Sequence, residues 1–200
     1  KWLGLLKIDI LGLTELSILK NVLDLIGWTI NDLYNLPLDY VETIKGFREV
    51  DIEGIFQFVG DSTKSVLRQI HDLKHFNQLV DCVTLSKPGP AHSGGTTNYL
   101  ARSRGETVPG FDWHPILEKI THSTHYQIIY QEQVINIVKE VGNLSFTAAN
   151  AIRNAMAKSK GENVFNSYWE PFKNGAIVNG FTEKQANRVW ESMKTMGRWA

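Results

Sequence analysis

Three basic residues gather in the stretch NAIRNAMAKSKGE, which covers residues 150–162. On a helix, Arg153 and Lys160 lie on the same side because they are seven residues apart, and Lys158 is only slightly offset. Such a ridge suits phosphate groups, since arginine forks onto phosphate and lysine supplies a point charge. Most charge clusters are solvated helix faces, so the pattern alone favours that interpretation and leaves a phosphate-binding surface as the alternative.

A second charged pair stands near the start of the chain, in the stretch KIDI. If this stretch is a strand, Lys7 and Asp9 share one face, while Ile8 and Ile10 share the other, because successive side chains alternate. The polar face would then present a cation beside a carboxylate. Such a pair is either a surface ion pair or part of a site, and the alternation alone leaves both interpretations open.

Two further polar positions adjoin features that fix the backbone. Lys87 precedes Pro-Gly-Pro, a rigid turn that could hold a lysine towards an anion, although solvent exposure is the commoner fate of such a residue. Gln131 and Glu132 open an amphipathic helix in IIYQEQVINI, where an acidic residue interacts favourably with the helix dipole. The pattern alone favours an N-terminal capping turn there.

Two pairs of histidines have spacings that metal ligands can adopt. His71 and His75 are four residues apart on a predicted helix, which is a legitimate spacing for two ligands, and His122 and His125 are three apart. No third ligand is specified by spacing, and the sequence has no HExxH, P-loop, GxGxxG or GxSxG motif. A structural role is therefore preferred to a zinc site.

The elements that must position these residues are mostly helical. In the first half, Gly27 is expected to end an amphipathic helix whose apolar face consists of Leu16, Leu19, Leu23 and Ile26. Residues 62–79 are predicted to form one further helix, with an apolar set of Val66, Leu67, Ile70 and Leu73. Residues 86–95 are predicted to break the helical structure, and 91–112 to form a long loop.

The second half is more regular. A helix is predicted to end at Gly142, with its apolar positions at Tyr130, Val134, Ile137, Val138 and Val141. Ser145 or Thr147 could cap the next helix, whose expected buried face is Ala148, Ile152 and Met156. Thr182 and Gln185 match a capping box. The sequence thus predicts a mainly α protein with one or two strands near its N-terminus.

Bulk composition sets broad limits. The chain has 200 residues, of which 42% are hydrophobic, and its 21 basic residues balance 21 acidic ones. This balance gives no support by itself to a nucleic-acid partner, although a local basic stripe would suffice. Cys82 is the only cysteine, which fits an intracellular, reducing compartment, and no apolar run is long enough to span a membrane. Because the first residue is Lys, we interpret the chain as part of a longer protein.

Five motifs occur in an order that resembles one family. The stretches are KIDILGL, GIFQF, LSKPGP, IIYQEQV and IRNAMAKSK. They are similar, at similar spacing, to K-[FI]-D-[FI]-L-G-L, G-[IV]-F-Q-[LF]-E-S, R-P-G-P, [IV]-x-Y-Q-E-Q-V-M and L-R-R-A-M-x-K-K of the bacterial C-family replicative DNA polymerases, the polymerase III alpha subunits. The resemblance covers nearly the whole chain. One such motif would be weak, but five collinear motifs are specific.

The resemblance implies a division of the chain and a metal site. Residues 1–14 would be the end of the polymerase palm, with a short β-strand, and 15–200 a helical fingers region that is incomplete at its C-terminus. Asp9 matches the third of three catalytic aspartates that hold two Mg²⁺ ions, and Lys7 matches the basic residue beside it, near the phosphates of the incoming nucleotide. In the two-metal mechanism the ions clamp the attacking and leaving oxygens of nucleotidyl transfer.

The resemblance also implies how substrates are bound. The nucleotide-binding residues would be Lys7, Lys87, Gln131, Arg153 and Lys158, and those binding DNA would be Arg102, Arg104 and Lys160. Primer–template DNA and a dNTP would be the substrates, with a sliding clamp and other replisome subunits as partners of the intact protein. The expected location is the cytoplasm of a bacterium or phage-infected host, with no membrane association.

Several positions depart from the family pattern. The paired upstream aspartates are not in this chain, E-S-x-G-M is replaced by residues 59–63, and the first residue of R-P-G-P is Lys87. Asn154 stands where the family has a second arginine, which removes a positive charge. An alternative function is therefore a non-catalytic helical DNA-binding or scaffolding module derived from the fingers. A histidine-based metal hydrolase is a third, weaker hypothesis.

Overall fold

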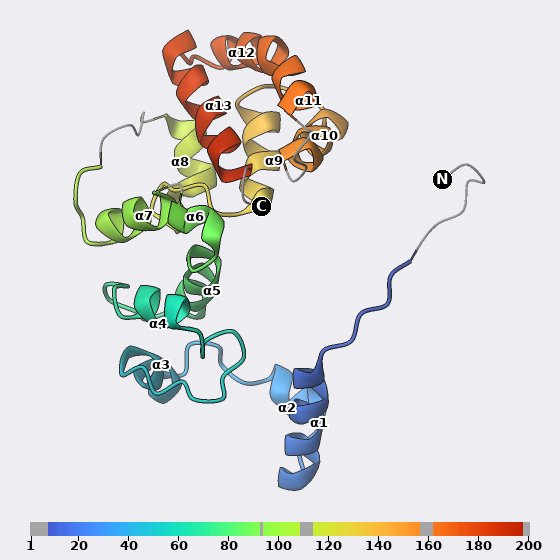
Figure 1. Ribbon diagram of the computed structural model, residues 1–200, viewed down its shortest axis with the longest axis vertical. Coiled ribbons are helices and arrows are strands. Elements are labelled where there is room, and N and C mark those ends of the chain that lie inside the picture. Colours follow the sequence, from blue (N-terminus) through green and yellow to red (C-terminus); the bar gives the residue numbers. More distant parts are fainter. Residues whose placement is uncertain (1–7, 93, 109–113, 157–161, 198–200) are drawn as a thin grey trace. The chain divides into compact units, whose positions relative to one another are not determined.

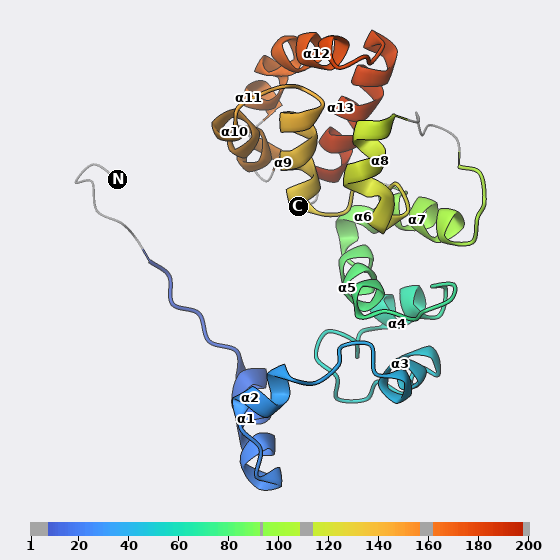
Figure 2. The same cartoon turned by 180° about the vertical axis from the view of Figure 1, so that it is seen from behind.

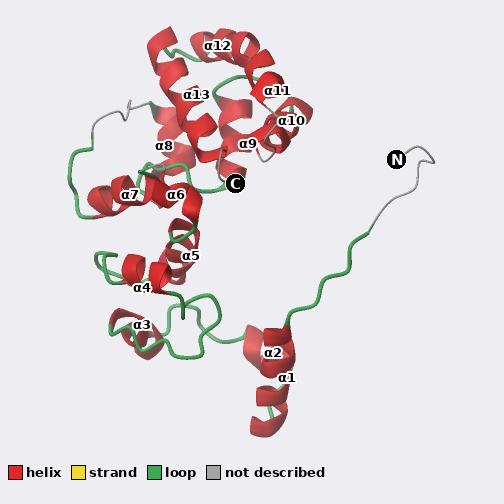
Figure 3. Ribbon diagram, in the orientation of Figure 1, coloured by secondary structure: helices red, strands yellow, loops and turns green. Residues whose placement is uncertain are grey.

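The computed structural model describes residues 8–92, 94–108, 114–156 and 162–197. Within these ranges all regular secondary structure is helical, with thirteen α-helices, one 3₁₀ turn and no strand (Figure 3). This confirms the prediction of a mainly α protein. The chain divides into two units, Lys1–Tyr40 and Val41–Ala200. No helix in the described ranges combines the length and the apolar content that a membrane span requires.

The first unit contains α1 (Thr14–Ile26) and α2 (Ile30–Tyr34). Gly27 ends α1 as predicted: it adopts a left-handed conformation at φ 70°, and the amide of Trp28 donates to the carbonyl of Leu23 at 2.9 Å. Leu23 is buried, whereas Leu16 remains 60% exposed, so most of the apolar face of α1 is not covered within this unit.

The β-strand predicted at the start of the chain is not formed over the residues described there, from Ile8 onward. Lys7 lies outside the described residues, and Ile8, Asp9 and Ile10 have no regular secondary structure. Ile10 is 94% exposed, so the expected packed face is absent as well. A strand is stabilised by backbone hydrogen bonds to a neighbouring strand, and the described part of the chain offers none. The alternation of apolar and polar residues in KIDI therefore predicted a strand for which the described residues supply no neighbouring strand.

The second unit begins with α3 (Val41–Arg48), α4 (Asp61–Leu67), α5 (Phe76–Leu85), α6 (Pro88–His92) and α7 (Gly95–Ser103). These helices and the turns between them form one hydrophobic core. Its buried members are Ile44, Phe47, Ile52, Phe58, Val66, Leu67, Ile70, Leu73, Leu79, Cys82, Leu85, Tyr99, Leu100 and Ile129. The GIFQF stretch forms turns, and its Phe58 is buried in this core.

Two sequence predictions in this region were wrong. Residues 62–79 form two helices rather than one, because the chain turns between α4 and α5 and Asp72 adopts a positive φ of 55°. The four predicted apolar residues are nevertheless all buried in the same core. The periodicity thus identified the inward-facing residues correctly but could not detect the break between two short helices.

The prolines of SKPGP also behave differently from the prediction. They do end α5, but Pro88 then begins α6 instead of opening a long loop, and α7 occupies much of the predicted loop at 91–112. The first turn of a helix has no intrahelical acceptors for its N–H groups, so prolines are tolerated there. Pro88 and Pro90 both lie in that first turn.

A second core lies among the remaining helices, which Figures 1 and 2 show packed together. They are α8 (Pro115–Thr121), η1 (His122–Thr124), α9 (Gln131–Glu140), α10 (Phe146–Met156), α11 (Glu162–Ser167), α12 (Trp169–Val178) and α13 (Glu183–Gly197). The fully buried residues at its centre include Val134, Ile137, Val138, Val141, Ala149, Ile152, Phe172, Ala176, Ala186 and Met193. The predicted apolar face of α9 is thus confirmed at its valines and isoleucine, whereas Tyr130 is the N-cap residue and packs against the first core.

The predicted caps in this half are formed. The Ser145 hydroxyl accepts a hydrogen bond from the amide of Ala148 at 3.2 Å, and Thr182 and Gln185 exchange side chain to backbone bonds at 2.9 and 3.2 Å. The buried face of α10 is rotated slightly from the prediction. Ala149 and Ala155 are buried beside Ile152, in place of Ala148 and Met156.

Helix α12 approaches the end of α9 so closely that neither Gly142 nor Gly175 has room for a side chain. A Cβ atom at Gly175 would lie 1.8 Å from the carbonyl oxygen of Gly142, and a Cβ atom at Gly142 would lie 2.4 Å from Cδ2 of Phe172. The side-chain amide of Asn179 also donates to the carbonyls of Glu140 and Val141, both at 2.9 Å. This contact therefore fixes α12 against the C-terminus of α9.

We expect Gly175→Ala to destabilise the protein by about 3 kcal/mol, because the added carbon meets rigid backbone. Gly46→Ala is the matched control: Gly46 also lies in a helix, α3, but the nearest atom to its added Cβ is 3.9 Å away. That substitution should be neutral or stabilise by up to about 1 kcal/mol. Urea unfolding measures both, and equal midpoints for the two variants would contradict the close approach.

Candidate functional site

Of the two sequence-predicted residues at the chain start, the structure describes only Asp9. Asp9 is exposed in the segment before α1, and Lys7 is outside the described residues. Among the described residues, no group of three or more His, Cys, Asp and Glu side chains lies close enough to hold a metal ion. The set of carboxylates that a two-metal site needs is therefore not assembled by the described part of this chain.

Two of the predicted nucleotide-binding residues are brought together. Arg153 on α10 donates from Nη1 to Oε1 of Gln131, the first residue of α9, at 3.3 Å. Its Nη2 donates to the side-chain oxygen of Asn154 at 2.9 Å. Both Arg153 and Gln131 are partly exposed, so the pair forms a polar position where α9 begins. Lys158 and Lys160 lie outside the described residues.

The guanidinium of Arg153 is incompletely satisfied. Its Nε is buried and has no hydrogen-bond partner among the described residues. Buried polar atoms without a partner are uncommon in folded proteins and are a sign of strain, of a missing ligand or of function. Because a planar guanidinium can bind a phosphate through two parallel bonds, the Gln131–Arg153 pair suits an anionic ligand.

The capping turn that the sequence favours at the start of α9 is formed, and Gln133 closes it. Oε1 of Gln133 accepts hydrogen bonds from the amides of Ile129 and Tyr130, at 2.8 and 3.0 Å, and its Nε2 donates to the Thr124 hydroxyl at 2.7 Å. Gln133 is buried. It stands three residues after the N-cap Tyr130, which is the capping-box position.

A buried carboxylate was also missed. Asp81 on α5 is only 3% exposed, and its two oxygens accept hydrogen bonds from two phenols: Tyr99 on α7, at 2.7 Å, and Tyr130 at the N-cap of α9. Burial raises the pKa of Asp81, against the opposing effect of the two tyrosine hydrogen bonds and of His125. The sequence signal was an aspartate in the otherwise apolar run LVDCV.

The same burial affects the groups around this carboxylate. It raises the pKa of both tyrosines and, for each, the neighbouring Asp81 adds to the shift. The His125 ring lies edge-on to Tyr99, with centroids 4.9 Å apart, and burial lowers the pKa of His125. Asp81, Tyr99, Tyr130 and His125 therefore form one polar cluster, which we call the Asp81 cluster.

The two arginines expected to bind DNA differ in their surroundings. Arg102 is partly buried, and its Nη1 donates to the carbonyl of Tyr126 at 2.8 Å and to Oε1 of Gln127 at 3.3 Å. Burial lowers the pKa of Arg102. Arg104 is more exposed and pairs with Glu106 at 2.6 Å. Arg102 thus ties α7 to the segment that leads into α9.

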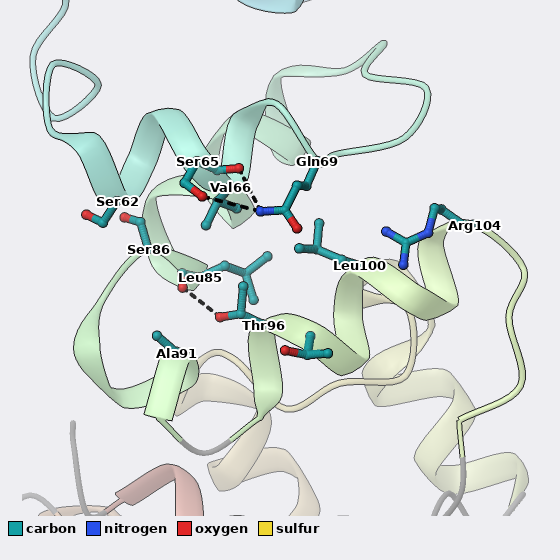
Figure 4. A pocket seen from close by; sticks show the side chains of 11 residues that line it. Ser62, Ser65, Val66, Gln69, Leu85, Ser86, Ala91, Thr96, Leu100 and Arg104 are labelled. Atoms are coloured by element: carbon teal, nitrogen blue, oxygen red, sulfur yellow. Dashed lines mark hydrogen bonds between the residues drawn. The ribbon is translucent and has the colours of Figure 1, made fainter.

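Arg104 also lines a pocket of about 330 Å³ formed by α4, α6, α7 and the end of α5 (Figure 4). Most of the polar lining consists of hydroxyl groups, from Ser62, Ser65, Ser86, Thr96 and Thr97. Lys87 follows Ser86 and is exposed at the turn into α6. The replaced segment 59–63 contributes here, since the Thr63 hydroxyl donates to the Ser86 hydroxyl at 3.0 Å and so links α4 to this turn.

The fold and these positions define an all-α module with a cationic, partly exposed position at the start of a helix. The profile of the bacterial DNA polymerase III alpha subunit finger domain matches residues 15–180. The chain therefore belongs to the family of bacterial DNA polymerase III alpha subunit finger domains. The resemblance seen in the five sequence motifs is confirmed.

Individual relatives agree with this assignment. The chain is 33% identical over 192 residues to DNA polymerase III subunit alpha of Staphylococcus aureus (strain COL), covering 94% of this chain. The identity and coverage are the same for DNA polymerase III subunit alpha of Staphylococcus epidermidis (strain RP62A). The chain spans only 18% of the length of these relatives.

Cys82 provides a test of the core beneath this region. The thiol is fully buried, its Sγ lies 3.7 Å from the carbonyl oxygen of Thr63, and burial raises its pKa to about 12. At pH 8 the thiol is therefore protonated as well as inaccessible, and the thiolate is the reactive form. We expect iodoacetamide to leave Cys82 unmodified in the native protein and to label it fully in guanidinium chloride.

Mass spectrometry of the peptide that contains Cys82 measures the labelling of this thiol in the native and in the denatured protein. Rapid labelling under native conditions would contradict the burial of α5 against α4.

Proposed function

We propose that this chain is the fingers region, with the end of the palm at residues 1–14, of a template-directed DNA polymerase. The polymerase would transfer a nucleotidyl group from a dNTP to a primer 3′-OH during DNA replication. Besides the family membership, the observation that carries this proposal is the Gln131–Arg153 pair. It places beside the first residue of α9 a guanidinium whose buried Nε has no hydrogen-bond partner among the described residues, and an anionic triphosphate would find donors there.

Within this proposal the nucleotide is bound mainly by Arg153 and Gln131, with Lys87, Lys158 and Lys7 as further cations. Arg153 and Gln131 would contact the triphosphate directly, because both are partly exposed and already joined to each other. Lys87 is exposed on a turn fixed by prolines, so its ammonium group could reach an anion without local rearrangement. A compact triphosphate carries several negative charges, which converging cations stabilise.

DNA contact is assigned to Arg104, Arg102 and Lys160. Of the first two, Arg104 is better placed for a phosphate of primer–template DNA, because it is exposed and its partner Glu106 is an exposed residue that DNA could displace. Arg102 would contribute chiefly by holding α7 in place through the carbonyl of Tyr126. A sliding clamp and other replisome subunits would be partners of the intact protein, in the cytoplasm.

Asp9 is proposed as one ligand of two Mg²⁺ ions, which would supply the Lewis-acid chemistry of the reaction. The described residues do not fit this site by themselves, because they contain no cluster of three potential ligands. Further carboxylates would have to come from outside the described residues. Sequence preceding residue 1 in the parent protein should then contain D-x-D after an apolar strand.

One observation favours the second function, a non-catalytic DNA-binding or scaffolding module. Asn154 stands where the family motif has an arginine, and its side-chain oxygen engages Nη2 of Arg153 instead of adding a charge. The absence of D-x-D from the parent sequence would support this module, and its presence would support the polymerase.

The polymerase proposal predicts that Asp9→Asn in the full-length protein abolishes primer extension with Mg²⁺. The substitution removes the charge that binds metal but keeps the size of the side chain. Asp9 is exposed, so the unfolding midpoint should not change. Gel-based extension of a primed template measures activity, and near-normal extension by the variant would refute the assignment of Asp9.

The nucleotide site is tested separately with Arg153→Gln. Loss of a charged hydrogen bond to a triphosphate should raise the KM for dNTP by about 10-fold or more. Lys184→Gln is the matched control, because Lys184 is an exposed cation on α13 and its loss changes the net charge equally. Single-nucleotide incorporation kinetics measure both variants. Equal KM values for the two would remove Arg153 from the site.

A further inference from the structure

The Asp81 cluster connects three elements that are distant in sequence. Asp81 comes from α5 and Tyr99 from α7, while Tyr130 is the N-cap residue of α9. Each carboxylate oxygen accepts one phenolic hydrogen bond, so the two tyrosines compete for no common acceptor. Burying a carboxylate is energetically unfavourable unless it is hydrogen-bonded. The two phenolic hydrogen bonds therefore offset the loss of water around Asp81.

The Tyr130 side of the cluster leads directly to the candidate nucleotide site. Tyr130 is adjacent to Gln131, and Gln131 accepts the hydrogen bond from Arg153. The backbone amide of Tyr130 is itself held by Gln133. The residue before the nucleotide-binding pair is therefore fixed twice, through its side chain by Asp81 and through its backbone by Gln133.

We propose that Asp81 is a positioning residue: its bond to Tyr130 fixes the first turn of α9 and thereby the Gln131–Arg153 pair for nucleotide binding. This inference rests on the proposed polymerase function. Asp81 itself contacts no substrate, because it is buried beneath the two phenols. It acts through geometry, so its loss should weaken the binding of the nucleotide more than it slows the chemical step.

Tyr99 provides a matched control that the chain itself offers. Tyr99 and Tyr130 each donate one phenolic hydrogen bond to the same carboxylate, so Tyr99→Phe and Tyr130→Phe delete the same chemical group. Tyr99 belongs to α7 and the first core, far in sequence from Gln131 and Arg153. If the cluster only stabilised the fold, the two substitutions would have the same consequences for nucleotide binding.

The experiment compares Tyr130→Phe, Tyr99→Phe and Asp81→Asn in the full-length protein with the wild type. Both Phe variants keep the aromatic ring and should fold, with lowered unfolding midpoints. Steady-state incorporation should show the KM for dNTP raised by about 5-fold in Tyr130→Phe, with kcat within about 2-fold of wild type. Tyr99→Phe should leave KM within about 2-fold. Asp81→Asn should resemble Tyr130→Phe if it folds.

Equal KM values for the two Phe variants would overturn the inference.

Amide hydrogen exchange supplies a readout independent of polymerase activity. Tyr130→Phe should accelerate exchange of amides in the first turn of α9, and Tyr99→Phe should not. If the wild-type protein extends no primer, the proposed function fails, and exchange alone decides whether Asp81 fixes α9. Unchanged exchange at the start of α9 in Tyr130→Phe would overturn the inference even if wild-type extension is normal.

Discussion

Within the unit Val41–Ala200, the chain passes from one hydrophobic core to the other in the short stretch between Ile129 and Val134. Ile129 belongs to the first core and Val134 to the second. The amide of Ile129 is buried at the start of this stretch, so it needs a partner within the protein. Gln133 satisfies the amides on one side of the crossing, and Asp81 receives the phenol of Tyr130 on the other. The position of α9, and with it the Gln131–Arg153 pair, depends on these two residues.

This arrangement supports the pair of residues proposed to bind the nucleotide. Arg153 on α10 donates to Gln131, the first residue of α9, while its buried Nε has no hydrogen-bond partner among the described residues. The rigid crossing supplies that support. Arg102 strengthens it from another direction, because it binds the carbonyl of Tyr126 on the segment that leads to the crossing.

The sequence predicted those elements whose signals are local. The apolar face of α9, the glycine at the end of α1 and the caps at Ser145 and Thr182 all depend on residues a few positions apart. The division of residues 62–79 into two helices and the helix begun by Pro88 were missed. In both cases a short helix is stabilised by tertiary packing, which overrides local propensity.

The candidate site was predicted only in part. The family motifs pointed to Gln131 and Arg153 one by one, but their hydrogen bond links residues on two helices and could not be derived from spacing. Asp81 escaped notice because its partners are 18 and 49 residues away. The strand expected at KIDI failed for the same reason, since its pairing partner would have to come from elsewhere.

The contact between Gly142 and Gly175 has an evolutionary consequence. Gly142 reads in the sequence as an ordinary helix stop, a position where asparagine is often an acceptable substitute. Its carbonyl, however, occupies the space where Gly175 would carry a carbon, and Phe172 occupies the space beside Gly142 itself. Neither glycine can be replaced by a larger residue alone, and replacing one makes no room for a side chain at the other. Sequence divergence in this region must therefore proceed around two fixed points, one at the end of α9 and one within α12.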